Sequence, residues 1–271
     1  MPAALYLVAT PIGNLEDITL RALRVLREAD LIACEDTRQT GKLLAHFGIA
    51  DKPMVSYHEH NETARTQELV AKLEGGRSIA LVSDAGTPLV SDPGYRLVTA
   101  AISAGIPVVP IPGASAVLGG LAAAGLPTEA FRFCGFLPPK QGQRKKALEA
   151  LRGEDCTLIF YEAPHRILDT LADLAGVYGD RPVVVARELT KMHEEFLRGT
   201  ADEVRVQLAV RPSVKGEITL LIAKGAPVIA TTPVEDAVRE LEQKGVPRMD
   251  AIKQVARERG LSKREVYKQL M

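Results

Sequence analysis

The sequence LVSDAGTPLVSDPG, residues 81–94, changes at Asp84 from an apolar run to two short turns. The apolar run predicts a buried strand, and the turns predict a loop at its carboxyl end. In open α/β sheets, ligands bind in the crevice beyond the carboxyl ends of the strands. Gly86 would let the backbone approach such a ligand, and Pro88 would stiffen the turn. The loop is therefore either a ligand site or a strand-to-helix connection in which Ser91 or Asp92 caps the next helix.

Apolar runs of the same kind lie on both sides of this loop and alternate with stretches of helical periodicity. The runs are Leu5–Ala9, Asp30–Cys34, Met54–Tyr57 and Pro107–Ile111. Together with the central run they make five βα units, which predict a parallel α/β domain over residues 1–115. Only Gly13 stands in the first turn, where a dinucleotide fold needs Gly-x-Gly-x-x-Gly, so a nicotinamide or flavin site is not expected.

A second loop of small residues, Pro-Gly-Ala-Ser-Ala at 112–116, follows the last of these runs and leads directly into a helix. The free amides and the dipole of a helix N-terminus suit a carboxylate or a hydroxyl-rich ligand. Set beside the 84–94 loop, it predicts a cradle made of two loops. Such a cradle fits a compact zwitterion better than the pyrophosphate of a dinucleotide.

Residues 116–226 predict a second α/β domain, with a mixed sheet. Its strands are expected at Phe131–Phe136, Thr157–Tyr161, Pro182–Ala186 and Glu217–Ile222. A basic hinge at residues 138–146, marked by proline and glycine, is expected to be mobile.

Residues 230–271 predict a separate unit of three short helices, with capping boxes at Thr232–Glu235 and Ser262–Glu265. The last two helices resemble a helix-turn-helix and carry most of the basic residues of this unit. The unit is either a nucleic-acid contact or a simple helical cap.

The 271-residue chain is 46% apolar and 25% charged, which is typical of a globular protein in water. It shows no secretion leader, and its longest uncharged stretch is broken by proline and glycine, so no membrane span is expected. Three separated cysteines without metal spacing indicate a reduced, cytoplasmic protein with no metal site. The formal net charge is zero, yet residues 132–152 hold six basic side chains against one acid, so the chain can still present a positive face.

Five motifs in a fixed order carry a family resemblance. They are YLVATPIGNL at 6–15, CEDTR at 34–38, SDAGTPLVSDPG at 83–94, PIPGAS at 110–115 and YEAPHR at 161–166. Over essentially its whole length the chain resembles the small-subunit ribosomal RNA methyltransferase I family of the tetrapyrrole methylase superfamily. The resemblance implies a homodimer that binds S-adenosylmethionine between two α/β domains. It also implies methyl transfer to the ribose 2′-hydroxyl of a cytidine in the decoding region of 16S ribosomal RNA, as free RNA or in the small ribosomal subunit.

The resemblance also implies site residues. The cofactor would be held by the first loop, the two small-residue loops and the second domain, at Pro11, Ser83, Asp84, Ala85, Gly86, Pro88, Ser115, Ala116, Tyr161, Gly216 and Glu217. The first loop is less glycine-rich than in porphyrin-modifying members of the superfamily, which favours the RNA branch.

Methyl transfer to a hydroxyl benefits from a base, and Glu35 or Asp36, at the end of a predicted strand, is expected to supply it. The alternative role of Asp36 or Thr37 is to cap the next helix. RNA phosphates would be bound by cations, which are Arg38, Lys140, Arg144, Lys145, Lys146 and Arg187. Two other functions stay open: a porphyrin-type methylase, and a DNA-binding regulator that senses S-adenosylmethionine.

Overall fold

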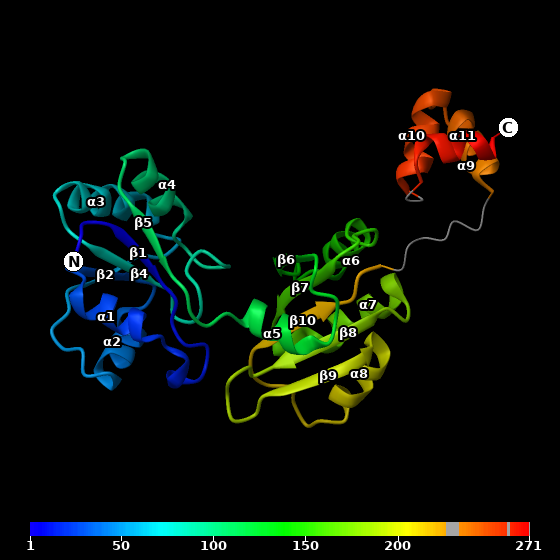
Figure 1. Cartoon of the computed structure of the whole chain (residues 1–271). Coiled ribbons are helices and arrows are strands. Elements are labelled where there is room, and N and C mark those ends of the chain that lie inside the picture. The colour runs from blue at the N-terminus through cyan, green and yellow to red at the C-terminus, as the bar shows by residue number, and fades with distance from the viewer. Residues whose placement is uncertain (226–232, 259–260, 271) are drawn as a thin grey trace.

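A computed structural model describes residues 1–225, 233–258 and 261–270. These residues form two five-stranded sheets that follow one another along the chain, and a group of C-terminal helices (Figure 1). The predicted α/β class is confirmed.

All strands of the first sheet are parallel, as predicted, in the order β3-β2-β4-β1-β5. The strands are β1 (Leu5–Val8), β2 (Leu31–Cys34), β3 (Met54–Ser56), β4 (Ile79–Val82) and β5 (Val108–Ile111). The central strand of the sheet, β4, is buried along its whole length, which explains its continuous apolar sequence. The 84–94 loop follows β4 at its carboxyl end.

Helices cover both faces of this sheet. They are η1 (Leu15–Asp17), α1 (Leu20–Glu28), α2 (Thr37–His46), α3 (Glu62–Glu74) and α4 (Tyr95–Ser103). Successive side chains of a strand point to opposite faces, so Tyr6 and Val8 pack in the core with α1 and α2, while Leu5 packs with α3 and α4. The loops at the carboxyl ends of the strands are thereby fixed from both sides.

The second sheet is mixed, as predicted, and has the order β6-β7-β10-β8-β9. Its strands are β6 (Phe131–Phe136), β7 (Thr157–Glu162), β8 (Pro182–Arg187), β9 (Glu195–Thr200) and β10 (Ile218–Ile222). Strands β6 and β7 are parallel, and the other neighbours are antiparallel. The edge strand β9 was not predicted from the sequence.

Helix α5 (Ala116–Ala124) packs on one face of this sheet, and the other face is covered by α6 (Gln141–Ala150), α7 (Ile167–Tyr178) and α8 (Ala201–Ala209). The short turn η2 (Pro164–Arg166) precedes α7. Helix α5 follows directly after β5, and therefore joins the first sheet to the core of the second. Gly120 lets it approach closely, because a β-carbon there would lie 3.2 Å from Thr219 Cγ2.

The expectation of a mobile basic hinge at residues 138–146 is wrong. Residues from Gln141 onward form the first turns of α6, and Arg144 on its inner face is buried. Its guanidinium is held by the carboxylate of Asp173 on α7, with Nη2 to Oδ2 at 2.7 Å. A buried, paired charge at this position anchors the segment to the core.

Helices α9 (Val234–Gln243), α10 (Arg248–Glu258) and α11 (Lys263–Gln269) share a small core of their own. The predicted capping box of Ser262 and Glu265 is confirmed at α11, while Thr232 lies outside the described residues. The predicted domain limits at 115, 226 and 230 stay predictions. None of the helices in the described part of the chain is both long and apolar enough to span a membrane.

Candidate functional site

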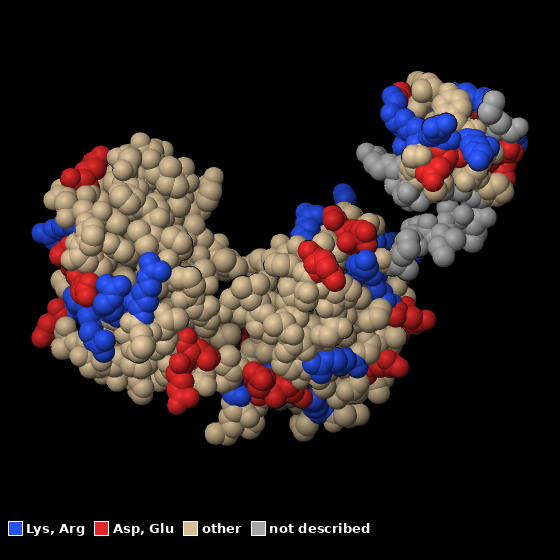
Figure 2. Space-filling view, in the orientation of Figure 1, with Lys and Arg blue, Asp and Glu red and all other residues tan. Residues whose placement is uncertain are grey.

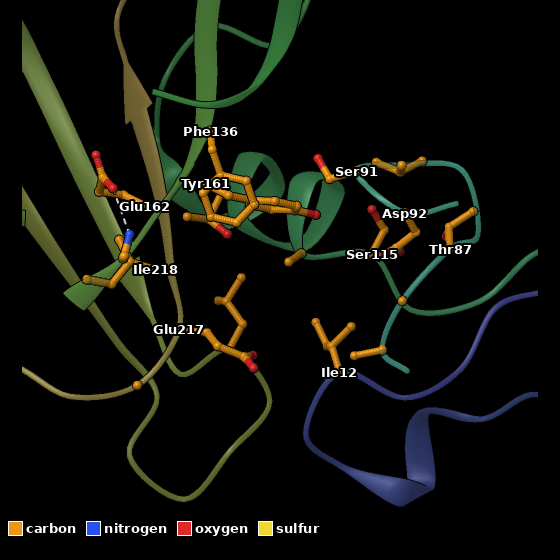
Figure 3. A pocket seen from close by; sticks show the side chains of 18 of the residues that line it. Ile12, Thr87, Ser91, Asp92, Ser115, Phe136, Tyr161, Glu162, Glu217 and Ile218 are labelled. Atoms are coloured by element: carbon orange, nitrogen blue, oxygen red, sulfur yellow. Dashed lines mark hydrogen bonds between the residues drawn. The ribbon is translucent and has the colours of Figure 1, made fainter. Parts of the chain in front are cut away.

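A cavity of about 370 Å³ lies where the loops of the first sheet face the second sheet. Its walls come from the loop after β1, the loop after β4, the start of α5 and the second sheet with its connections (Figure 3). The lining residues are Ile12, Ala85, Gly86, Thr87, Val90, Ser91, Asp92, Ser115, Ala116, Phe136, Tyr161, Glu162, Ala163, Pro164, Leu189, Gly216, Glu217, Ile218 and Thr219. The lining is mostly apolar with a few polar groups, as in small-molecule sites.

Backbone hydrogen bonds hold the first-sheet loops side by side. The N–H of Thr10 donates to the carbonyl of Gly86 at 2.9 Å, and the N–H of Gly86 donates back to Thr10 at 3.0 Å. The hydroxyl of Thr87 donates to the carbonyl of Ala114 at 3.3 Å. The loops after β1, β4 and β5 are therefore connected, and two of them form the predicted cradle.

Glycines allow these loops to approach closely. Gly86 has φ of +86°, and a β-carbon there would lie 3.4 Å from Ile12 Cγ2. A β-carbon at Gly113 would lie 2.9 Å from the β-carbon of Ala9. Larger residues at either position would push the loops apart or into the cavity.

The opposite wall of the cavity is aromatic. The Tyr161 ring makes edge contacts with Phe133 and Phe136, with centroids 4.9 and 5.6 Å away. Burial, followed by the negative charges of Asp92 and Glu217, raises the pKa of Tyr161 to about 12, so this phenol is neutral and can donate a hydrogen bond. Such a wall suits a flat, polar ring system.

Seven of the eleven predicted cofactor contacts line this cavity, namely Ala85, Gly86, Ser115, Ala116, Tyr161, Gly216 and Glu217. The other four do not. Ser83 and Pro88 are buried, and Asp84 accepts a hydrogen bond from the backbone N–H of Asp36. Pro11 lies next to the lining residue Ile12 but not on the wall itself. That the seven residues bind a cofactor stays a prediction.

Asp92 lines the cavity but was not among the predicted contacts, and one of the two interpretations of its loop made Ser91 or Asp92 a helix cap. That interpretation is wrong: the N-cap of α4 is Gly94, with no capping side chain. Leu89 and Ser91 have φ of +73° and +66°, values that non-glycine residues seldom adopt. Strained backbone of this kind is common at functional sites. Phe136 and Ile12, also missed, look like ordinary apolar residues in the sequence.

Neither of the two predicted bases lines the cavity. Asp36 caps α2 by accepting from the N–H of Arg38 at 2.8 Å, and its carboxylate also pairs with the Arg38 guanidinium. These hydrogen bonds lower the pKa of Asp36 to about 2, which does not favour a role as a base; that role stays a prediction. Burial, together with the charge of Asp84, raises the pKa of Glu35.

The predicted phosphate-binding cations fall into two groups. Lys140, Lys145 and Lys146 are exposed around the start of α6, and Arg38 is 86% exposed. Arg144 is 3% exposed, and its donors are used by Asp173 and the carbonyl of Pro139, so its predicted contact with RNA is wrong. Arg187 is also engaged, with Glu195 and the carbonyl of Lys215. This leaves Arg187 few donors for a phosphate.

Groups of three or more His, Cys, Asp or Glu side chains arranged to hold a metal ion do not occur among the described residues. The chemistry available at the cavity is that of carboxyl, hydroxyl and backbone groups facing an aromatic wall.

Residues 4–205 match the family model of the tetrapyrrole (corrin/porphyrin) methylases. The chain is 53% identical over 271 aligned residues to ribosomal RNA small subunit methyltransferase I of Halalkalibacterium halodurans. The alignment covers 97% of this chain and 93% of the relative. The crystal structure of uroporphyrin-III-C-methyltransferase from Thermus thermophilus has the same fold, with a TM-score of 0.55 and 25% sequence identity. The superposition covers 81% of this chain and 94% of that chain.

A second structure of that Thermus enzyme, in complex with S-adenosylhomocysteine, matches with TM-score 0.55 and 22% identity, covering 80% of this chain and 96% of that chain. The match over residues 4–205 spans the first sheet, α5 and the second sheet except β10, and so includes most of the cavity lining; the lining residues 216–219 lie beyond it. The chain therefore belongs to the tetrapyrrole methylase family, and within it to the ribosomal RNA small subunit methyltransferase I family.

Proposed function

We propose that the chain transfers a methyl group from S-adenosylmethionine to the 2′-hydroxyl of a cytidine in 16S ribosomal RNA. The observation that carries this proposal is the identity of 53% over 97% of the chain with a ribosomal RNA small subunit methyltransferase. The cavity between the two sheets supports it, because it combines a small-residue cradle with an aromatic wall.

The cavity fits the two ends of the cofactor. The cradle of Gly86 and Ser115 offers backbone amides and the N-terminus of α5, which suit the carboxylate of a methionine moiety. Across the cavity, Tyr161 and Phe136 offer ring faces and edges for an adenine. Glu217 lies on the same side and offers a carboxylate to hydroxyl or amino groups (Figure 3).

When bound, S-adenosylmethionine supplies an electrophilic methyl group on a sulfonium sulfur. The chain must hold the ribose oxygen close to that group and in line with the bond that breaks. The apolar parts of the wall, such as Val90, Leu189 and Ile218, keep water from competing with the ribose hydroxyl.

RNA capture would fall to exposed cations. Lys140 and Lys146 are exposed around the N-terminal turns of α6, and Lys145 is exposed beside the buried Arg144. Figure 2 shows further lysine and arginine side chains gathered on the C-terminal helices. Such cations can neutralise phosphates without reading the sequence, which leaves the choice of nucleotide to the cavity.

The proposal includes a homodimer. Leu118 on α5 is 56% exposed and Met192 is 94% exposed, and Leu118 lines a second cavity together with Thr190, which lies close to Met192 in the chain. Large exposed apolar side chains of this kind are common where two subunits meet. Sedimentation of the purified chain tests this part, and a monomer at micromolar concentration contradicts it.

The experiment that tests the proposed activity offers S-adenosylmethionine labelled in its methyl group to small ribosomal subunits, to free ribosomal RNA and to uroporphyrinogen. Label in RNA supports the proposal. Label in uroporphyrinogen alone would instead assign the chain to the porphyrin branch, and binding to duplex DNA without any methyl transfer would favour a regulator.

A further inference from the structure

Asp92 is the carboxylate that the first-sheet loops bring to the cavity wall. It follows Ser91, whose φ is +66°, and precedes Pro93, so its backbone is held in a turn with little freedom. Figure 3 shows Asp92 beside Ser115 on one side of the cavity, with Tyr161 and Phe136 on the other. The carboxyl therefore lies between the cradle and the aromatic wall.

The side chains around Asp92 favour a carboxyl that can take up a proton. Burial first, and then the negative charges of Glu35 and Asp84, raise the pKa of Asp92 to about 6. Ser83 Oγ is buried and makes no hydrogen bond of normal geometry to a described residue, yet it lies close enough to favour the charged carboxylate. A base with a pKa just below the working pH is both unprotonated and strong enough to act.

We propose that the Asp92 carboxylate accepts the proton of the attacking ribose hydroxyl, and that Glu35 acts through Asp92 as a positioning residue. This rests on the proposed function. The O–H bond of the ribose breaks as its proton passes to Asp92 Oδ, and a bond forms between the ribose oxygen and the methyl carbon. The bond from that carbon to sulfur breaks, its electron pair returns to sulfur, and Asp92 later releases the proton to water.

The placement of the carboxyls decides between Asp92 and the two bases expected from the sequence. Only Asp92 of the three lines the cavity. Asp36 is paired with Arg38, and Glu35 does not line the cavity, although its charge acts on Asp92. The strand-end motif that contains Glu35 thus contributes electrostatically to the site without touching the acceptor.

The pH dependence follows from the groups that face Asp92. They are Glu35 after β2, Asp84 after β4 and Tyr161 on β7. Tyr161 stays neutral through the physiological range, so burial and the charges of the two carboxylates determine where Asp92 titrates. The rate of methyl transfer should rise with pH through about 6 as Asp92 loses its proton, and then level off. Removing the charge of Glu35 should move this rise to lower pH.

The test measures single-turnover methyl transfer from labelled S-adenosylmethionine to small ribosomal subunits between pH 5 and 8.5. Asp92→Asn should lower the rate at pH 7.5 by about 100-fold, within the range for a lost general base. Its affinity for S-adenosylhomocysteine, measured by calorimetry, should stay within about twofold of the wild type because the proton acceptor is not needed for binding. Glu35→Gln should shift the acid limb of the profile to lower pH, because it removes a negative charge that raises the pKa of Asp92.

Asp169→Asn, which alters an exposed carboxyl on α7, is the matched control and should keep the wild-type rate and profile. An Asp92→Asn variant that methylates at the wild-type rate overturns the proposal. So does one that loses S-adenosylhomocysteine binding in parallel with the rate, since that assigns Asp92 to binding. An unchanged acid limb in Glu35→Gln removes the role of Glu35. If the wild type labels no RNA, the proposed function itself fails, which is a separate result.

Discussion

Lys191 lies directly across the backbone of Gly13, so that a β-carbon at position 13 would come within 2.4 Å of Lys191 Cγ. The ammonium of Lys191 donates to Glu188 Oε1 at 2.8 Å and to Glu217 Oε2 at 3.1 Å. The first loop of the first sheet thus lies against the loop between β8 and β9, and Lys191 connects that loop to Glu217, which lines the cavity. This contact sets how closely the two walls of the cavity approach.

Gly13→Ala should therefore weaken cofactor binding. The new methyl group must displace the Lys191 stem, which moves Glu217 and widens the cavity. We expect the affinity for S-adenosylhomocysteine, measured by calorimetry, to fall about tenfold, which corresponds to roughly 1.4 kcal/mol.

Gly142→Ala is the matched control for this substitution. Nothing lies within 4 Å of a β-carbon at position 142, and alanine is favoured over glycine in a helix such as α6. Binding should be unchanged in this variant. Equal affinities in the two variants would show that the Lys191 contact does not shape the cavity.

Asp92→Asn should make the protein more stable at neutral pH. The pKa of Asp92 rises from 3.8 to about 6 on folding, so the folded state disfavours the charged form. Above pH 6 the Asp92 carboxyl is charged in the folded and in the unfolded state, and the burial of that charge lowers the free energy of unfolding in full. Below pH 3.8 the carboxyl is neutral in both states, and this destabilisation disappears. The full shift corresponds to about 3 kcal/mol. Screening at this half-buried site reduces the expected gain to about 1–2 kcal/mol.

Denaturant unfolding of the wild type and Asp92→Asn at pH 8 and pH 4 checks this expectation. The difference in the free energy of unfolding should be present at pH 8 and nearly absent at pH 4. A difference of the opposite sign at pH 8 would mean that the folded protein stabilises the Asp92 charge.

Arg144→Ala should destabilise the fold without acting through RNA. The substitution leaves the carboxylate of Asp173 buried and without its main partner, which costs about 3–5 kcal/mol in other proteins. Lys145→Ala removes a neighbouring cation that is 46% exposed and 3.6 Å from the same carboxylate. That change should cost less than about 1 kcal/mol. Urea unfolding distinguishes the two variants, and equal losses would contradict the structural role of Arg144.

Alanine at Lys140, Lys145 and Lys146 together should weaken the binding of small-subunit RNA and make it less sensitive to salt. Each phosphate contact contributes about 0.7–0.9 to the slope of log affinity against log salt, so the slope should fall by roughly 2. The control replaces three exposed cations of the first-sheet helices, Arg21, Arg24 and Lys42, and changes the net charge equally. If both triple variants lower the slope alike, the α6 lysines have no specific role.

Much of the fold could be predicted because it depends on local patterns. Buried strands such as β2 are uniformly apolar, so the strand predicted at residues 30–34 lies at Leu31–Cys34, and the one predicted at 107–111 lies at Val108–Ile111. Strand β9 was missed because its polar residues are stabilised only by partners distant in sequence. Glu195 pairs with Arg211, and Arg198 donates to the carbonyl of Ala124. Such contacts leave no periodic signal.

The site was predicted less completely, for a related reason. Gly86 and Ser115 stand in conspicuous small-residue loops, and both line the cavity. Arg144 could not be distinguished from the exposed Lys145 beside it, because the side chain that buries it, Asp173, lies one helix further along the chain. Asp92 resembles a helix cap until the backbone shows that Gly94 takes that position.

The measurement that most directly tests the central claim is a map of the methylated nucleotide. Small ribosomal subunits lacking the modification are incubated with the purified chain and labelled S-adenosylmethionine, and their RNA is digested to nucleosides. We predict a single labelled product, 2′-O-methylcytidine, from one position of 16S ribosomal RNA. Label on a base, on another nucleoside, or only on a porphyrin would contradict the account.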